Sequence, residues 1–144
     1  MIEAARRLRG APDLADLDVV ICGDGSELEE LRARSADLGD GVPRVLLRPL
    51  QPLDRLGELL GLADLHLLPQ RAAASELVLP SKLANMLASG RPVVAAAGQR
   101  SQLAEEVAGC GLVVAPDSVD ALAGGIAALA RAPRLRDALG RAGR

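Results

Sequence analysis

The sequence predicts an α/β domain with a doubly wound parallel sheet, on three observations. Short, β-rich apolar runs alternate along the chain with longer segments of helical period. The apolar runs are continuous, as in DVVIC at Asp18–Cys22, which is typical of a strand covered on both faces. The 144 residues, 49% of them apolar, contain no internal repeat or low-complexity linker. Because such alternation requires crossovers between parallel strands, we expect one Rossmann-like domain over residues 1–144.

Each predicted element follows from its residue pattern. The strands are expected over residues 18–22, 44–47, 64–68, 93–96 and 112–114. The helices are expected over residues 1–9, 26–39, 53–62, 80–89, 101–108, 118–130 and 133–142. Ser26 and Glu29 have the spacing of a capping box, so the second helix is expected to begin at Ser26. Gly90 suits the C-terminal cap of the helix over 80–89, which Pro92 cannot continue.

The chain opens with a helix that no strand precedes. In a βα architecture the helix over residues 1–9 should follow a strand and be connected to it. The sequence therefore leads us to expect that this domain is truncated at its N-terminus.

Composition excludes several classes of protein. The net charge of −2 comes from 17 basic and 19 acidic residues without a basic block, so no nucleic-acid partner is expected. Aromatic residues are absent, which removes base-stacking platforms and the interfacial belt of a membrane protein. No signal peptide or apolar run of about 20 residues is present, so a cytoplasmic location is expected. Cys22 and Cys110 are too few for a disulfide scaffold or a zinc site.

Ligands of doubly wound sheets bind at the carboxyl ends of the strands. Gly23-Asp24-Gly25 follows the first predicted strand, Arg48-Pro49 the second and Pro69-Gln70 the third. The two glycines of the first turn permit close backbone approach, but the third glycine of a dinucleotide fingerprint is missing. A plain turn explains this segment equally well. His66, within the third strand and without a second ligand nearby, is interpreted as structural.

The segment LPSKLANMLASGRPVV, Leu79–Val94, is the strongest candidate site. Lys82 is the only lysine of the chain and Asn85 the only asparagine, and they lie three positions apart. Lys82 falls in the first turn of a helix, where the helix dipole disfavours a cation. A bound anion beside Lys82 would explain its position.

A diphosphate fits this helix start chemically. It would accept hydrogen bonds from the free backbone amides of the helix start and from the Ser81 hydroxyl, and it would pair with Lys82. Pro80 and Leu83 are predicted to belong to the same nucleotide-sugar-binding site. Asn85, one turn further on, would reach a ribose hydroxyl. An ordinary helix start with a solvated lysine explains the same residues, and the physical arguments leave both interpretations open.

Four segments together carry a family resemblance. The order GDG (Gly23–Gly25), ADLHLLPQ (Ala63–Gln70), LPSKLANMLASGRPVV and GCGLVVAPDSVDALA (Gly109–Ala123) resembles the C-terminal domain of family-4, GT-B-fold glycosyltransferases. Within that family the chain most resembles the colanic-acid-type (WcaI-like) transferases. The resemblance covers essentially the entire chain, and the Pro-Ser-Lys helix followed by Ser-Gly-Arg-Pro-Val-Val is its specific part. It implies one half of a GT-B fold.

The resemblance implies a donor half that binds a UDP- or GDP-sugar without a metal or another cofactor. It implies retaining transfer of the sugar to a glycan or lipid-linked acceptor in exopolysaccharide synthesis. Ser81 and Lys82 would hold the diphosphate, and Lys82 would act on the leaving group. Asn85 stands where the family commonly has a ribose-binding Glu. Glu76 falls near the position of a Glu beside the sugar, although Leu77 aligns better.

The resemblance also implies parts that this sequence lacks. These are an N-terminal acceptor domain, the first strand of this half and a final helix, so the chain alone is expected to be inactive. Acceptor binding, and any peripheral association with the inner face of a membrane, would need those parts. An inactive fragment that keeps only the fold or nucleotide binding is the first alternative. A receiver-like signalling module is less favoured because Lys82 opens a helix, and an epimerase or oxidoreductase because the glycine fingerprint is incomplete.

Overall fold

The computed structural model describes residues 1–39, 41, 43–71 and 79–144, and it confirms the predicted α/β fold class. Its strands are β1 (Asp18–Cys22), β2 (Arg44–Arg48), β3 (His66–Pro69), β4 (Val93–Ala96) and β5 (Gly111–Val114). Its helices are α1 (Ile2–Leu8), α2 (Leu28–Ala36), α3 (Leu56–Gly61), α5 (Lys82–Ala88), α6 (Gln102–Val107), α7 (Val119–Ala130) and α8 (Pro133–Ala142), with 3-10 turns η1 (Pro12–Leu14) and η2 (Leu53–Arg55). The helix predicted over 53–62 is thus divided into η2 and α3.

The strands are all parallel but form two hydrogen-bonded sheets instead of the single sheet expected. One sheet holds β1 and β2, with Asp18 opposite Arg44, and the other holds β3, β4 and β5 in that order. His66 and Gly111 lie opposite Val93 on its two sides. In the residues that the structure describes, no backbone hydrogen bond joins β1 to β3. Hydrogen-bonded strands lie about 4.8 Å apart. β1 and β3 each have a hydrogen-bonded neighbour strand on one side only, which is β2 for β1 and β4 for β3.

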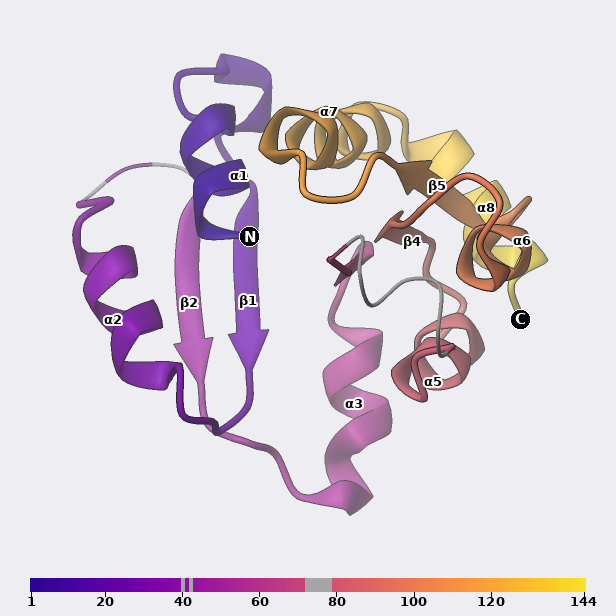
Figure 1. Ribbon diagram of the computed structural model, residues 1–144, viewed down its shortest axis with the longest axis horizontal. Coiled ribbons are helices and arrows are strands. Elements are labelled where there is room, and N and C mark those ends of the chain that lie inside the picture. The colour runs from indigo at the N-terminus through magenta and orange to yellow at the C-terminus, as the bar shows by residue number, and fades with distance from the viewer. Residues whose placement is uncertain (40, 42, 72–78) are drawn as a thin grey trace.

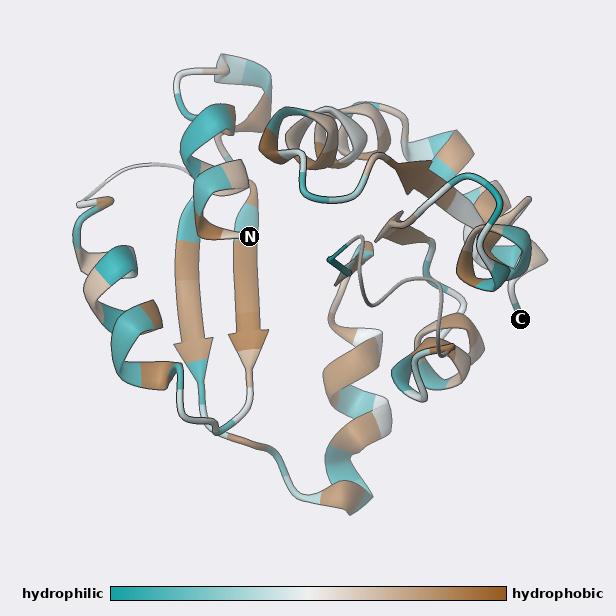
Figure 2. Ribbon diagram, viewed as in Figure 1, coloured by the Kyte–Doolittle hydropathy of each residue, from teal (hydrophilic) through white to brown (hydrophobic). Residues whose placement is uncertain are grey.

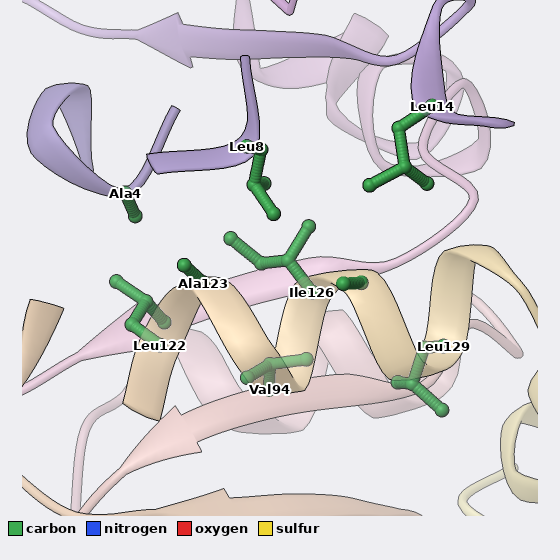
Figure 3. Packing of buried hydrophobic residues seen from close by; sticks show 9 residues of the cluster. Ala4, Leu8, Leu14, Val94, Leu122, Ala123, Ile126 and Leu129 are labelled. Atoms are coloured by element: carbon green, nitrogen blue, oxygen red, sulfur yellow. The ribbon is translucent and has the colours of Figure 1, made fainter. Parts of the chain in front are cut away.

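Helices cover the strands on both faces of the larger sheet. On one face, α7 packs beside α1, and Leu8, Leu14, Val94 and Ile126 meet in a buried cluster (Figures 1 and 3). On the other face, α5 and α6 contribute to a second cluster with β3 and β4, which includes Leu83. The central parts of the strands are hydrophobic while α2 is mostly hydrophilic (Figure 2). The core therefore lies around β4, whose residues are all buried.

Burial differs between the two sheets. β4 is a continuous apolar run that is buried on both faces, as its sequence predicts. β1 has the same kind of sequence, yet only Val19 is buried and Val20 is 54% exposed. The prediction that β1 is covered on both faces is therefore wrong, because none of the described segments covers its Val20 side. Cys22 at its end is half-buried.

Local side-chain bonds set several helix starts. Ser101 and Ser118 accept hydrogen bonds from the backbone of α6 and α7 and cap both helices where expected. The capping box predicted at Ser26 is wrong: residues 26 and 27 form a turn, and α2 begins at Leu28 without a side-chain cap. Glu29 instead pairs with Arg32, one turn along the helix, at 2.6 Å.

Candidate functional site

The carboxyl ends of β1 and β2 form a pocket of about 230 Å³. It is lined by Gly23, Asp24, Leu28, Arg32, Leu47, Arg48 and Pro49. The Gly23 N–H donates to the Arg48 carbonyl at 3.1 Å, which continues the strand pairing one residue beyond β1. Gly23 has a φ of 151°, a conformation that favours glycine. Gly23, Asp24 and Arg48 are therefore brought together as predicted, while Gly25 does not line the pocket.

Arg48 is the pocket's available cation. Its guanidinium donates to the carbonyl of Leu47 at 3.2 Å, and no ion pair to Arg48 occurs in the described part of the chain. Arg32, by contrast, is paired with Glu29. Ligand pockets usually have volumes of about 300–1,000 Å³, so this pocket would hold only part of a nucleotide sugar. Leu28 and Arg32 were not predicted as site residues, although their spacing of four places them on one face of a helix.

The start of α5 is the second group of predicted residues. Lys82, the first residue of α5, is exposed, and it makes no hydrogen bond or ion pair with the residues that the structure describes. Ser81 is exposed at the N-cap position, and its hydroxyl forms no capping bond. Asn85 is exposed one turn further on. None of these three side chains is bonded to another side chain of the described residues, and their contact with a ligand stays a prediction.

Pro80 and Leu83 hold the start of this helix. The Pro80 carbonyl accepts a hydrogen bond from the Leu83 N–H at 3.0 Å. The Leu83 side chain is only 2% exposed and packs in the cluster with Leu68 and Val93. Leu83 was predicted among the nucleotide-sugar-binding residues, but its side chain lies in the core and its amide is already bonded. Its contribution is therefore to anchor α5.

A buried histidine sets the direction of α5. His66 Nε2 lies 2.9 Å from the Oγ of Ser89, the residue that follows α5. His66 is at the amino end of β3, so the carboxyl end of α5 lies at that edge of the sheet. The seven residues of α5 rise about 10 Å, and Lys82 therefore lies towards the carboxyl end of β3. Burial, followed by the charge of Arg91, lowers the pKa of His66, as expected for a structural histidine.

Gln70 provides a further polar group at the same edge. Its backbone N–H donates to the Ala96 carbonyl at 3.3 Å, directly after β3. Its side-chain Oε1 is buried and has no hydrogen-bond partner among the residues that the structure describes. A buried acceptor without a donor is unfavourable, so this atom marks a place where a ligand donor would be stabilising. Glu76, the predicted residue beside the donor sugar, lies outside the described residues, as does Leu77.

The two groups of candidate residues belong to different sheets. The pocket belongs to β1 and β2, and the start of α5 belongs to the sheet of β3 to β5. Across the described ranges, no hydrogen bond or ion pair links Gly23, Asp24 or Arg48 to Ser81 or Lys82.

No group of three or more His, Cys, Asp or Glu side chains that could hold a metal ion occurs among the described residues. The carboxylate of Asp18, at the amino end of β1, pairs with Arg44. None of the helices in the described ranges is long and apolar enough to span a membrane.

A parallel α/β domain with helices on both faces of a sheet has a Rossmann-like fold. The model of the family "Glycosyl transferases group 1" matches residues 1–132. The chain therefore belongs to the group 1 glycosyl transferases, as its sequence predicts.

Three individual proteins illustrate this relationship. WcaI of Escherichia coli (strain K12), named for colanic acid biosynthesis and glycosyl transfer, is 39% identical over 129 residues, which are 88% of this chain and 30% of WcaI. HepE of Anabaena, solved with UDP-glucose, superposes with a TM-score of 0.71 at 19% identity, over 95% of this chain and 40% of HepE. Sucrose-phosphate synthase of Thermosynechococcus elongatus superposes with a TM-score of 0.71 at 23% identity, over 99% of this chain and 36% of the synthase. The chain thus spans less than half the length of each.

Proposed function

We propose that this chain is the donor-binding half of a retaining glycosyltransferase. The complete enzyme would transfer a sugar from a UDP- or GDP-sugar to a glycan or lipid-linked acceptor in cell-surface polysaccharide synthesis. The observation that carries the proposal is Lys82, an exposed cation at the start of α5 that pairs with no described residue, in a chain that belongs to a glycosyltransferase family. The name of WcaI and the UDP-containing structures of HepE support the same substrate class.

The chemistry assigned to the site is stabilisation of a leaving group. When the bond between the sugar and the diphosphate breaks, negative charge grows on the diphosphate oxygens. Lys82 and the Ser81 hydroxyl would stabilise that charge, with Lys82 acting as an electrostatic group and not as a base. Asn85 would hydrogen-bond a ribose hydroxyl, and Glu76 would face the sugar. In this proposal the reaction needs no metal ion.

The pocket at β1 and β2 would hold another part of the donor. Arg48 supplies a cation there, and the Gly23 turn lets the backbone approach the ligand closely. The pocket is too small for a whole nucleotide sugar, so we assign it one end of the molecule only. Gly25, outside the lining, would act through the shape of the turn.

The acceptor would be bound by parts of the enzyme beyond this chain. The chain corresponds to 30% of the length of WcaI, and transfer by such an enzyme would take place in a cleft between two halves. We therefore expect nucleotide binding without sugar transfer from the 144-residue chain. We also propose that the complete enzyme works in the cytoplasm, where membrane association would come from other parts.

Calorimetric titration of the chain with UDP, GDP and their sugars tests the proposal. Lys82→Ala is expected to weaken binding several-fold, and Lys82→Arg to retain part of the affinity because it keeps the charge. Arg134→Ala is the matched control, since it removes an exposed cation from α8. Unchanged affinity in Lys82→Ala would remove Lys82 from the site.

An inactive domain that keeps only the fold is the competing function. If the unaltered chain bound none of these nucleotides, the donor-half proposal would fail and that alternative would stand. If nucleotides bind, fusing an acceptor half to the chain and assaying transfer distinguishes an active donor half from a binding-only domain.

A further inference from the structure

The pocket at the carboxyl ends of β1 and β2 is lined by one carboxylate and one guanidinium that are not bonded to each other. These are Asp24 and Arg48, and neither forms an ion pair with a residue in the described ranges. The third charged lining residue, Arg32, is already paired with Glu29 at 2.6 Å. A free carboxylate accepts hydrogen bonds and a guanidinium donates them. The pocket therefore offers an acceptor and a donor at separate points.

The backbone determines how these two residues are placed. In Figure 1 the ends of β1 and β2 lie side by side, and a loop leaves each strand at this edge. Cys22 lies opposite Arg48 in the strand pairing, and the Gly23 N–H donates to the Arg48 carbonyl at 3.1 Å. Asp24 follows Gly23 directly, so it leaves the strand end next to that of Arg48. Both Asp24 and Arg48 are exposed, so a molecule that enters from solvent can reach them.

The rest of the lining is mostly apolar. Leu28 and Leu47 are half-buried, and Pro49 is an exposed part of the wall. Apolar walls with a few polar groups suit a planar heterocycle, whose faces are apolar and whose polar groups lie at its edge. A diphosphate is less suited to this lining, because Asp24 would repel its negative charge. The base end of a nucleotide therefore fits this pocket better than its diphosphate does.

The polar groups at the edge distinguish one base from another. The two oxygens of an ionised carboxylate can accept from two neighbouring donors at once. Guanine has such a pair in N1–H and the N2 amino group, and its O6 and N7 are the two acceptors that arginine binds in a bidentate manner. Uracil has one N–H between two carbonyl oxygens, and adenine has one amino group beside an unprotonated ring nitrogen. Either base would therefore place an acceptor against the carboxylate.

We propose that this pocket selects guanine. The Asp24 carboxylate accepts from N1–H and the N2 amino group, and the Arg48 guanidinium donates to O6 and N7. The ring lies against Leu28 and Leu47. This inference rests on the proposed donor-binding function, and it narrows the donor from a UDP- or GDP-sugar to a GDP-sugar.

Calorimetric titration of the 144-residue chain with GDP, IDP and UDP tests the inference. IDP is the matched ligand, because its base differs from guanine only by lacking the N2 amino group. We expect GDP to bind about tenfold or more tightly than UDP and about fivefold or more tightly than IDP, since bidentate contacts discriminate between bases by about that much. This comparison of ligands uses the unaltered chain, so it does not depend on the folding of a variant.

Asp24→Asn tests whether the carboxylate is the source of the preference. It replaces one acceptor oxygen with a donor amide, so GDP and IDP should then bind within about twofold of each other. Asp137→Asn is the matched control, because it removes an exposed carboxylate from α8, outside the pocket, and it should keep the full preference. A preference for GDP over IDP that survives in Asp24→Asn overturns the role of Asp24.

Two further results would overturn the guanine assignment while the donor-half function stands. The first is equal affinity of the unaltered chain for GDP, IDP and UDP. The second is an Asp24→Asn variant that binds a GDP-sugar more weakly and GDP with unchanged affinity, because the pocket would then hold the sugar. Failure of every nucleotide to bind the unaltered chain is a different result, since it overturns the donor-half function and this inference with it.

Discussion

His66 Nε2 and Ser89 Oγ lie 2.9 Å apart, and their hydrogen bond joins the amino end of β3 to the residue after α5. The Ser89 hydroxyl donates onward to the Met86 carbonyl at 2.6 Å, so the imidazole donates through Nε2. The Arg91 N–H also donates to Ser89 Oγ, at 3.3 Å. This small network orients α5 and thereby places Lys82 at the opposite end of the helix.

Ser89→Ala is expected to destabilise the protein by about 1–3 kcal/mol, because it leaves the buried His66 N–H without an acceptor. Urea denaturation measures the loss. Ser26→Ala is the control: Ser26 is exposed and does not cap α2, so its loss should stay within about 0.5 kcal/mol. Equal losses in the two variants would contradict the importance of the network.

The free energy of unfolding should fall as the pH is lowered below about 6.5, the ordinary pKa of histidine. Burial lowers the pKa of His66 in the folded protein, so the unfolded chain binds the proton first. The contribution of His66 to stability is therefore complete above that pH, and it declines as the pH falls towards the lower folded pKa. Denaturation at pH 8 and pH 5 measures the effect.

His66→Gln is the control for the pH effect, and it should reduce the difference in stability between pH 8 and pH 5. Asp13 and Asp18 also have lowered pKa values, through hydrogen bonds from Arg131 and Arg44, but their ordinary value is 3.8 and they titrate at lower pH. An unchanged pH difference in His66→Gln would assign the effect to another group.

Two adjacent glycines of α7 should respond in opposite directions to alanine. A Cβ at Gly124 meets no atom within 4 Å, so Gly124→Ala should stabilise the helix by about 0.5–1 kcal/mol. A Cβ at Gly125 would lie 2.9 Å from Cγ1 of both Val94 and Val114. Gly125→Ala should therefore cost about 1–3 kcal/mol through overpacking. Thermal denaturation compares the two, and the same sign in both would contradict this packing.

Arg48 and Arg44 lie at opposite ends of β2 and form a matched pair for the proposed pocket. Arg48→Ala is expected to weaken nucleotide binding several-fold, because it removes the cation at the carboxyl end, which pairs with no carboxylate of the described residues. Arg44→Ala removes a cation that already pairs with Asp18 at the amino end. It should leave affinity unchanged and cost at most about 1 kcal/mol of stability. Equal weakening by both would indicate a general charge effect instead of a site.

Local sequence signals predicted many elements well. The helix over 133–142 and the strand over 93–96 have the predicted bounds, and Ser101 and Ser118 cap their helices as expected. Hydrophobic period and caps depend on neighbouring residues, so they can be recognised without the fold. The prediction at Ser26 was also based on neighbouring residues, but it failed. Ser26 and Glu29 have the spacing of a capping box, yet residues 26 and 27 form a turn and no side chain caps α2.

By itself, the sequence determined the α/β class, the direction of the strands and the residues that end them, because these follow from residue periodicity and short-range connections. Only the tertiary structure decided that β1 and β3 do not pair with each other, that Leu83 packs inward, and that Arg48 and Lys82 lie in separate groups. These features depend on which distant segments meet and which edges find a partner. Such contacts are set by packing across the whole chain, and no local pattern of residues encodes them.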